Sequence, residues 1–446
     1  MGEGSLEAPT RHAIDWRSAD FTNPEKLEAE LRRAFDICHG CRRCFNLCDS
    51  FPKLFDLVDE SETGELDSVS STDFKPIIDA CTLCDMCFMV KCPYVPPHEF
   101  DLDFPHLMLR ARAAQFKNND IPKIQQRLGE TDKNGKLGCS VSGLANWAGN
   151  CSNGLTRPLL QAVTGIDKNA ALPRFNKKPL ATQDQTFNIN TEAPAYGHRK
   201  AVIYTTCTGQ YHNDELALAT ARVLAKNGVE TQMLYPGCCG MPQLEHGDIA
   251  RVAENAKKIA TDLGPWIDKG YDVISPVASC SLMLKFEWPL IEPEDENVKK
   301  LSQATFDASE YLVGIAAKEG MAEGLKPLAG GVTLHIACHA RAQNMGRKGA
   351  ELLNLIPDTD INVIERCSGH GGSWGIYKDN FEVALKVGKP VARDTAKQGS
   401  GYVVSECPLA REHILQGVER LDANKPAAAR DQLQHPIQLM ALSYQD

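Results

Sequence analysis

Two short runs of closely spaced cysteines constrain this 446-residue chain more than any other feature of its sequence. The first run contains Cys38, Cys41, Cys44 and Cys48, and the second contains Cys81, Cys84, Cys87 and Cys92. Three cysteines separated by two residues each can hold three corners of a cubane, because every short loop brings the next thiolate back to one point. The fourth cysteine of each run is far enough along the chain to reach the other cubane. The two runs therefore predict two [4Fe–4S] clusters.

The ligand sets are expected to cross between the runs. One cluster would use Cys38, Cys41, Cys44 and Cys92, and the other would use Cys81, Cys84, Cys87 and Cys48. Zinc is the alternative, since structural zinc sites with four thiolate ligands also use short spacings. Zinc sites usually pair two CxxC units, whereas four cysteines in one run, present twice, favour cubanes.

Helical sequence surrounds these runs. Residues 24–48 are rich in helix formers, and Leu27, Leu31 and Phe35 are spaced to form one apolar face. Asn23 before Pro24 is typical of an N-cap followed by proline in the first turn. We therefore expect residues 1–110 to form an all-helical ferredoxin domain, of the kind found in iron–sulfur subunits of respiratory dehydrogenases.

Composition narrows the setting of the protein. Seventeen cysteines in a chain without a visible secretory signal point to metal ligands in a reducing compartment, and hence to a cytoplasmic protein. The formal net charge of −10 argues against non-specific binding to nucleic acid or to an anionic membrane. No apolar run approaches the length that spans a bilayer. Docking at the inner face of the membrane through a partner stays open.

An internal duplication occupies residues 199–446. Strands are predicted at 200–207, 229–235 and 271–277, and again at 332–338, 361–367 and 401–407, with helices between them. Equivalent cysteines are offset by 131, 129 and 127 residues. Such regular offsets predict two α/β halves with parallel sheets, at 199–325 and 326–446. Residues 111–198 are expected to be a helical and irregular linker, so the fold class is a multidomain α+β protein.

Each half places cysteines at its strand ends. The first half has Cys207, Cys238, Cys239 and Cys280, and the second has Cys338, Cys367 and Cys407. Parallel strands bring their carboxyl ends to one edge of a sheet, which is where α/β folds bind ligands. The first half can therefore hold a third metal site. In the second half, where a serine replaces one thiolate, His339 or His370 could substitute as in Rieske centres, or could simply bond backbone groups.

The repeated Cys…Cys-Cys-Gly…Cys arrangement resembles the cysteine-rich domain found in the B subunit of heterodisulfide reductase. The segments that carry a wider resemblance are GCCGMPQLEHG at 237–247, SCSLMLKFEWP at 279–289, ACHARAQNMG at 337–346 and HPIQLMALS at 435–443. With the twin cysteine runs, they make nearly the whole chain similar to the group that includes the C subunit of anaerobic glycerol-3-phosphate dehydrogenase. This resemblance implies an iron–sulfur protein that takes electrons from a flavin-containing dehydrogenase and passes them towards membrane quinones.

The resemblance also implies cysteine-rich domains that can hold unusual clusters with five cysteine ligands. This chain departs from that pattern at Met283, Ser368 and Ala410, where further cysteines would stand. Neither half can supply five thiolates. The four of the first half suffice for an ordinary third cluster, whereas the second half is either a working site or a shell that supports the first.

Electron transfer is the function predicted, and two alternatives remain open. The cysteine-rich region could itself reduce a disulfide or a peroxide, or the chain could be a zinc-stabilised scaffold. No GxGxxG fingerprint lies between a strand and a helix, so electrons are expected to enter from a partner, either a flavoprotein dehydrogenase or another redox protein. Cys139 and Cys151 are interpreted as small buried residues, and the glycine-rich stretch 368–375 lacks the P-loop pattern.

Overall fold

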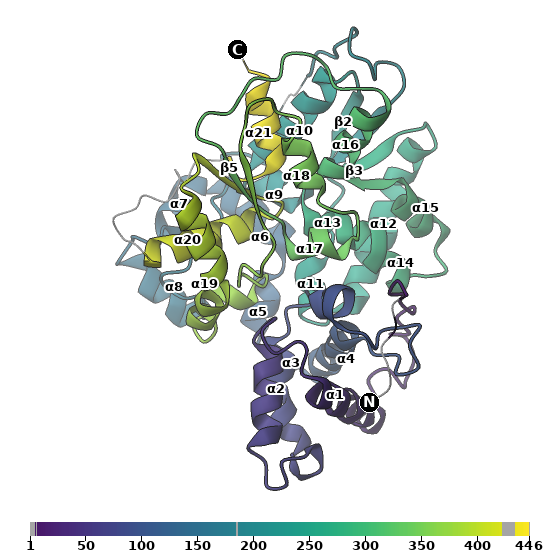
Figure 1. Ribbon diagram of the computed structural model, residues 1–446, viewed down its shortest axis with the longest axis vertical. Coiled ribbons are helices and arrows are strands. Elements are labelled where there is room, and N and C mark those ends of the chain that lie inside the picture. The colour runs from purple at the N-terminus through teal and green to yellow at the C-terminus, as the bar shows by residue number, and fades with distance from the viewer. Residues whose placement is uncertain (1–4, 6, 184–185, 422–432, 446) are drawn as a thin grey trace.

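The computed structural model describes residues 5, 7–183, 186–421 and 433–445. Helices of the N-terminal part form one end of the molecule, and two parallel sheets with their helices form the other (Figure 1). The N-terminal elements are α1 (Pro24–Cys41), α2 (Ser50–Asp59), the 3₁₀ helices η1 (Leu66–Ser68) and η2 (Ser71–Phe74), α3 (Lys75–Ala80), the π-helical turn η3 (Cys87–Lys91) and α4 (Phe104–Lys117). Among the described residues before β1, the regular elements are all helices.

Helix α1 begins as its sequence predicts. The side chain of Asn23 accepts a hydrogen bond from the Lys26 N–H, and Pro24 occupies the first turn. The apolar face that includes Leu27, Leu31 and Phe35 is buried. The helix stops at Cys41, before the end of the helix-forming stretch, because Arg42 adopts a left-handed conformation with φ 55°. This turn lets the rest of the first cysteine run fold back toward α1.

Four further helices connect the N-terminal part to the sheets along one side of the molecule (Figure 1). They are α5 (Lys123–Leu128), α6 (Thr131–Ser140), α7 (Ser142–Gly149) and α8 (Thr156–Thr164), followed by the 3₁₀ helix η4 (Leu180–Thr182). Helix α6 packs against α9 of the first half, and α7 packs against both α6 and α8.

The first cysteine-rich half contains a four-stranded parallel sheet of order β2-β1-β3-β4. Its strands are β1 (Lys200–Tyr204), β2 (Glu230–Leu234), β3 (Asp272–Ser275) and β4 (Thr305–Asp307). Its helices are α9 (Thr206–Tyr211), α10 (Asp214–Lys226), α11 (Met241–Glu245), α12 (Ile249–Ile267), α13 (Ala278–Leu282) with the π-helical η5 (Met283–Glu287), α14 (Trp288–Ile291), α15 (Glu296–Ala304) and α16 (Ala308–Lys318). Strand β4, only three residues long, is the one strand here that the sequence pattern does not predict.

The second half repeats this arrangement with a three-stranded parallel sheet of order β6-β5-β7. Its strands are β5 (Val332–His335), β6 (Ile361–Ile364) and β7 (Tyr402–Ser405). Its helices are α17 (Cys338–Ala342), α18 (Lys348–Leu353), the 3₁₀ helix η6 (Trp374–Ile376), α19 (Phe381–Gln398), α20 (Pro408–Leu421) and α21 (Pro436–Ser443). Because β5, β6 and β7 take the positions of β1, β2 and β3, the topology agrees with the duplication seen in the sequence.

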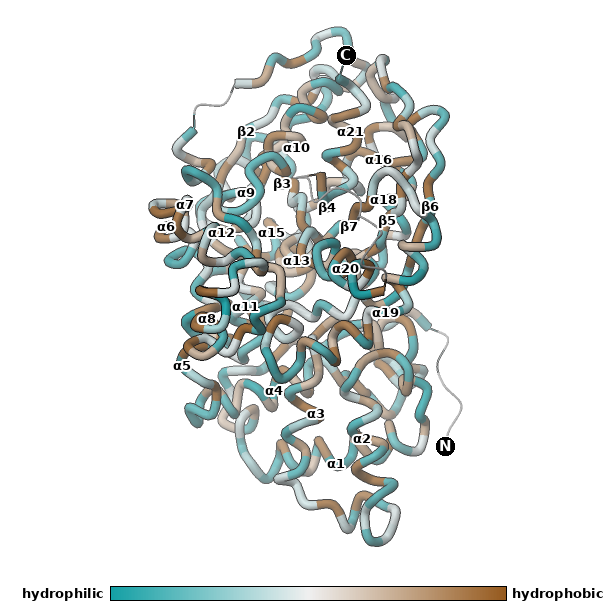
Figure 2. Tube along the Cα trace, turned by 90° about the vertical axis from the view of Figure 1, so that its left-hand side faces the viewer, coloured by the Kyte–Doolittle hydropathy of each residue, from teal (hydrophilic) through white to brown (hydrophobic). Residues whose placement is uncertain are grey.

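Apolar residues from the N-terminal part and from both halves form one large core. In Figure 2 hydrophobic residues appear as brown segments of the tube in all three parts. Helix α21 joins the halves, because it packs against α10 of the first and α18 of the second. Helices α13 and α17, which carry cysteines of the two halves, also pack against each other. Within the described ranges, none of the helices combines the length and apolar character that crossing a bilayer requires.

Candidate metal centres

A small cavity in the N-terminal part is lined by the four cysteines expected at the first cluster, Cys38, Cys41, Cys44 and Cys92. The cavity is completed mainly by apolar and aromatic side chains: Ile37, Phe51, Phe55, Pro93, Tyr94 and Leu102, with Arg43 beside them. Burial, with the Cys92 and Cys41 thiols close by, raises the pKa of Cys44 to about 12. The two cysteine runs therefore cross in space, as their spacing predicts.

The four cysteines expected at the second cluster, Cys48, Cys81, Cys84 and Cys87, also lie close together. Burial raises the pKa of the Cys48 thiol, and the nearby Cys84 and Cys81 raise it further. Cys87 has a raised pKa for the same reasons, burial first and then its neighbours Cys84 and Cys81. Cys48 of the first run thus joins the three cysteines of the second. Cys87 also lies near Cys44, so the two groups adjoin.

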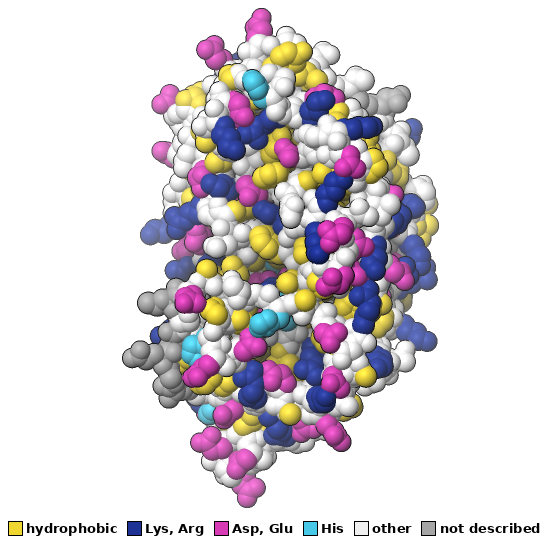
Figure 3. All heavy atoms as spheres, turned by 90° about the vertical axis from the view of Figure 1, so that its right-hand side faces the viewer, with side chains coloured by type: hydrophobic (Ala, Val, Ile, Leu, Met, Phe, Trp, Pro, Cys, Tyr) yellow, Lys and Arg dark blue, Asp and Glu magenta, His cyan; other side chains and the backbone are white. Residues whose placement is uncertain are grey.

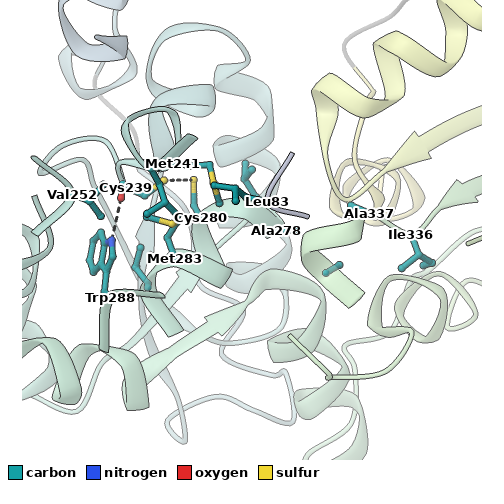
Figure 4. Packing of buried hydrophobic residues seen from close by; sticks show 14 of the residues in the cluster. Leu83, Cys239, Met241, Val252, Ala278, Cys280, Met283, Trp288, Ile336 and Ala337 are labelled. Atoms are coloured by element: carbon teal, nitrogen blue, oxygen red, sulfur yellow. Dashed lines mark hydrogen bonds between the residues drawn. The ribbon is translucent and has the colours of Figure 1, made fainter. Parts of the chain in front are cut away.

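The four cysteines of the first half converge at the carboxyl edge of its sheet. The Sγ atoms of Cys239 and Cys280 are 3.4 Å apart, and the indole N–H of Trp288 donates to the Cys239 carbonyl at 3.1 Å (Figure 4). The Cys207 and Cys238 thiols are hydrogen-bonded to each other, and this contact is the main cause that raises the pKa of Cys207 and lowers that of Cys238.

Local backbone geometry explains why these cysteines meet. Cys207 lies in the first turn of α9, directly after β1, and Cys280 lies in α13 directly after β3. Cys238 and Cys239 follow β2 and precede Gly240, which begins α11 with φ 87°. A left-handed residue at that position favours glycine, since a side chain would be strained there. The strand ends and the helix starts together bring the thiols to one point.

The second half brings three thiols toward the N-terminal part. Burial raises the pKa of Cys338, and its neighbours Cys84, Cys367 and Cys407 add to the shift. Burial and the nearby Cys367 raise the pKa of Cys84 to about 12. Cys407 has a raised pKa through burial, opposed by N–H groups of its own helix, and lies near Cys280 of the first half. The second half is thus placed between the second N-terminal group and the first-half thiols.

The two histidines considered as substitute ligands differ in their surroundings. Nδ1 of His339 lies 2.8 Å from the Ser279 hydroxyl, and its Nε2 lies 3.3 Å from the Leu83 carbonyl. Both ring nitrogens therefore have protein partners. His370 is buried, and its Nε2 has no hydrogen-bond partner among the described residues. Of the two, only His370 has a ring nitrogen without a protein partner among the described residues, and its ring lies 6.0 Å from that of His413.

No set of three or more His, Cys, Asp or Glu side chains within the described ranges converges closely enough to hold a single metal ion. A cubane makes a different demand, because its thiolates bind separate iron atoms and surround a volume. The cavity between Cys38, Cys41, Cys44 and Cys92 provides four thiolates around such a volume. The donor set and its apolar walls fit an iron–sulfur cluster.

Arg11 makes a charge network beside the second cysteine run that the sequence did not predict. Its guanidinium donates to both carboxylate oxygens of Asp85, at 2.7 and 2.9 Å, and reaches Asp103 at 2.9 Å and Glu287 at 3.1 Å. Burial alone would lower the pKa of Arg11, but these carboxylates outweigh it and raise the pKa. His106 bonds Glu287 at 3.1 Å, and with Arg11 it lowers the pKa of Glu287 to about 2 against the effect of burial.

This network connects the N-terminal part to the first half, because Asp85 lies within the second cysteine run and Glu287 ends η5. Arg112 makes a second buried connection, donating to the carbonyl oxygens of Ile78 and Cys81 and, at 3.0 Å, to that of Glu245 in α11. No local sequence signal marks these arginines, since their partners are distant in the chain.

Asp132 supports the first-half thiols from α6. Its carboxylate accepts the Cys238 N–H at 3.3 Å and the hydroxyl groups of Tyr211 and Tyr235. Cys139, in the same helix, is buried and donates to the Tyr211 carbonyl at 3.6 Å. Cys151 is half-buried and lies outside the thiol groups described above.

Residues 201–285 and 332–410 match the model of the CCG cysteine-rich domain, one segment in each half. The chain is 26% identical over 348 residues to the C subunit of the anaerobic glycerol-3-phosphate dehydrogenase of Escherichia coli (strain K12), covering 76% of this chain and 82% of that protein. It is 25% identical to the D subunit of the dihydromethanophenazine:CoB–CoM heterodisulfide reductase of Methanosarcina acetivorans, covering 78% and 90%.

A third relative, the B subunit of the fumarate reductase (CoM/CoB) of Methanothermobacter marburgensis, is 27% identical over 249 residues, which cover 54% of this chain and 46% of the relative. The two matches to the cysteine-rich domain fall on the two sheets, one in each half. Two segments of the chain thus match the CCG cysteine-rich domain, and over most of its length the chain is similar to the C subunit of anaerobic glycerol-3-phosphate dehydrogenase.

Proposed function

We propose that the protein is an electron-transfer subunit that links a flavin-dependent dehydrogenase to a downstream acceptor such as the quinone pool. The observation that carries this proposal is the continuous series of thiol groups inside one molecule. The two crossed groups adjoin through Cys87 and Cys44, the second-half thiols follow next to Cys84, and the first-half thiols follow next to Cys407. The relatives, named as subunits of oxidoreductases, support the same role.

In this proposal residues 1–110 are a helical ferredoxin domain with two [4Fe–4S] clusters, joined through 111–198 to the cysteine-rich halves at 199–325 and 326–446. The first cluster is held by Cys38, Cys41, Cys44 and Cys92, and the second by Cys48, Cys81, Cys84 and Cys87. A third centre is held by Cys207, Cys238, Cys239 and Cys280. The clusters would supply one-electron redox chemistry without bond-making to the substrate.

Two roles can be assigned to the second half, and they differ in the part played by His370. Its thiols Cys338, Cys367 and Cys407 are one short of a cubane ligand set. The buried, unpartnered Nε2 of His370 favours a fourth ligand from that side chain over one from His339. Without that ligand, the second half would hold no cluster and would only support the second N-terminal cysteine group and the first-half thiols on either side of it.

The chain's own residues set the environment of the clusters. Apolar side chains surround Cys38 and its partners, and the buried Arg112 places positive charge near Cys81, whereas the charge of Arg11 is offset by Asp85, Asp103 and Glu287. Burial, hydrogen bonds and net charge are the factors by which proteins adjust cluster potentials. Retention of these thiols as ligands requires a reducing compartment, in agreement with the cytoplasm.

The catalytic alternative, reduction of a disulfide or peroxide by the cysteine-rich region, needs a thiol that a substrate can reach. Cys238, Cys239 and Cys280 are only 4%, 2% and 4% exposed. Attack on an external disulfide requires access as well as a thiolate. Burial of these three thiols favours electron transfer over thiol catalysis in the first half, whereas in the second half Cys367 is exposed and stays open to a substrate.

Iron content and EPR spectra of anaerobically purified protein test the proposal. About twelve iron atoms and three distinguishable reduced centres are expected, against about eight for the N-terminal clusters alone. A zinc-loaded, EPR-silent protein would contradict the proposal. The crossed ligand sets give a sharper test: Cys92→Ser and Cys38→Ser should abolish the same signal, whereas Cys48→Ser and Cys81→Ser should abolish the other.

Cys151→Ala is the matched control, because this cysteine lies outside the groups, and it should leave iron content and spectra unchanged. The partner is tested by anaerobic affinity purification followed by flavin analysis of the bound fraction. A co-purifying flavoprotein whose electron transfer to a quinone analogue needs this chain is the expected result. Full quinone-linked activity of that flavoprotein without the chain would overturn the proposed role.

A further inference from the structure

The first four-cysteine group of the N-terminal part lies at two short turns of the chain. One is the turn that follows α1 and contains Arg43, Cys44 and Phe45. The other is the π-helical turn η3, which ends at Lys91 and leads directly into Cys92. Cys44 and Cys92 line the same cavity, so these turns, which come from the two different cysteine runs, meet at this group.

Each of the two turns exposes a large apolar side chain to solvent. Phe45 is 57% exposed and Val90, in η3, is 50% exposed. The ring of Phe45 stacks on the buried ring of Phe55, with 6.3 Å between the centroids, and Phe55 itself lines the cavity of the thiol group. The Phe45 side chain is therefore fixed by packing beside the cavity, while more than half of it stays open to a partner.

Two basic side chains accompany these apolar ones and have no acidic partner. Arg43 and Lys91 are exposed, and within the described ranges neither forms an ion pair. The adjacent Arg42, in contrast, is neutralised by Asp59. Burial raises the pKa of Cys44 and the positive charges of Lys91 and Arg43 oppose this rise, so both cations lie close to that thiol.

Unmatched positive charge is not a general property of this surface. The chain contains 58 acidic against 48 basic residues, and on the side drawn in Figure 3 acidic and basic side chains alternate with scattered hydrophobic ones. Unpaired cations beside an exposed aromatic ring favour an acidic protein partner, because rim charges steer association and aromatic residues with arginine are enriched at interfaces. We call Arg43, Phe45, Val90 and Lys91 the cluster face.

We propose that the cluster face is the docking site for a redox protein that is acidic around its own flavin, and that electrons enter the series of thiol groups there. This inference rests on the function proposed above and adds the point of entry. After docking, one electron leaves the partner's reduced flavin and is taken up at the group of Cys38, Cys41, Cys44 and Cys92. The partner is oxidised and this group's cluster is reduced, and no bond forms or breaks.

The other thiol groups are less suited to receive electrons from a large partner. Electron-transfer rates fall steeply with distance, and Cys238, Cys239 and Cys280 are 4% exposed or less. Cys367 is exposed, but it lies next to Cys84, in the middle of the series. Entry at Cys367 would bypass the first group, whereas entry at the cluster face uses the groups in turn from one end.

Stopped-flow reduction of the anaerobic holoprotein by flavodoxin hydroquinone, an acidic flavoprotein donor, tests the cluster face. The second-order rate constant should fall at least about tenfold for Arg43→Glu/Lys91→Glu, because the acidic rim of the donor is then repelled. Added salt should slow the reaction of the wild type and not that of this variant. Phe45→Ser keeps the charges but removes the apolar contact, and should slow the reaction at least about threefold.

The matched control is Arg251→Glu/Lys269→Glu, which makes the same change in net charge on the exposed surface of the first half and should react as the wild type does. Dithionite needs no docking face and should reduce the wild type and all variants to the same extent, which separates lost docking from a lost cluster. Equal flavodoxin rate constants for the wild type and Arg43→Glu/Lys91→Glu would overturn the cluster face and leave the electron-transfer function standing. A wild type that accepts no electrons even from dithionite would overturn both.

Discussion

Arg11 shows how much of the structure depends on one side chain that lies far from its partners in the sequence. Its side chain is 12% exposed and is surrounded by carboxylates from the second cysteine run, from the start of α4 and from the end of η5. It also lies over the ring of Phe88, 4.3 Å from its centroid. Lysine could not replace it, because only a guanidinium can donate in parallel to both oxygens of Asp85 while reaching two other carboxylates.

Replacement Arg11→Ala should destabilise the protein by about 3–5 kcal/mol, because it leaves Asp85 and Glu287 buried without their cation. The urea midpoint, followed by circular dichroism on anaerobic holoprotein, measures the effect. Arg251→Ala is the matched control, since Arg251 pairs with Glu254 on the surface, where an ion pair contributes about 0–1 kcal/mol. Equal midpoints for the two variants would show that the buried network does not stabilise the fold.

At this scale the grouping of the cysteines follows from the sequence, whereas the residues around them do not. Crossing of the two runs follows from loop length, which is local information, and the structure brings Cys92 to Cys38 as expected. Arg11 and Glu287 are separated by 276 residues and carry no motif, so only the folded chain reveals their contact. Residues that contact a site through tertiary structure alone leave no periodic or spaced pattern to detect.

The elements illustrate a similar division. Long amphipathic helices such as α10 and α12, and the buried strands, lie where the pattern places them. Strand β4 is too short for a detectable alternation, and the sequence pattern does not single out α6, because its glycines lower helix propensity. Those glycines are required by packing: a Cβ at Gly135 would lie 2.4 Å from the Tyr211 ring, and one at Gly138 would lie 2.2 Å from the Phe175 ring.

Substitution Gly138→Ala should therefore lower stability by about 1–3 kcal/mol, because the added methyl group overlaps an aromatic ring. Gly143→Ala, in the neighbouring α7, is the matched control. A Cβ there meets no atom within 4 Å, so the same change should raise stability by about 0.5–1 kcal/mol through helix propensity. Urea midpoints of both variants check the prediction, and a stabilised Gly138→Ala would mean that α6 can move away from Phe175.

Buried histidines make the stability of the whole molecule depend on pH. Burial lowers the pKa of His435 to about 3 and that of His335 to about 4. His435 caps α21, the helix that packs against both halves, by accepting the Ile437 N–H through Nδ1. A neutral histidine in the fold and a protonated one in the unfolded chain make stability fall as the pH decreases.

The sign and size of this effect can be measured at His435. Its folded pKa lies below the ordinary value near 6.5, so its contribution is complete above that value and is lost progressively as the pH falls toward 3. At pH 5 the loss amounts to about 2 kcal/mol.

The variant His435→Asn keeps a side chain that can cap α21 but cannot be protonated. Between pH 7 and pH 5 its stability should therefore decrease by about 2 kcal/mol less than that of the wild type, with exposed His12→Asn as the control that follows the wild type. Urea midpoints at the two pH values give this difference directly. Because each protein is compared with itself at pH 7, the packing lost on replacing histidine by asparagine cancels, and equal decreases would mean that the ring is protonated within the fold.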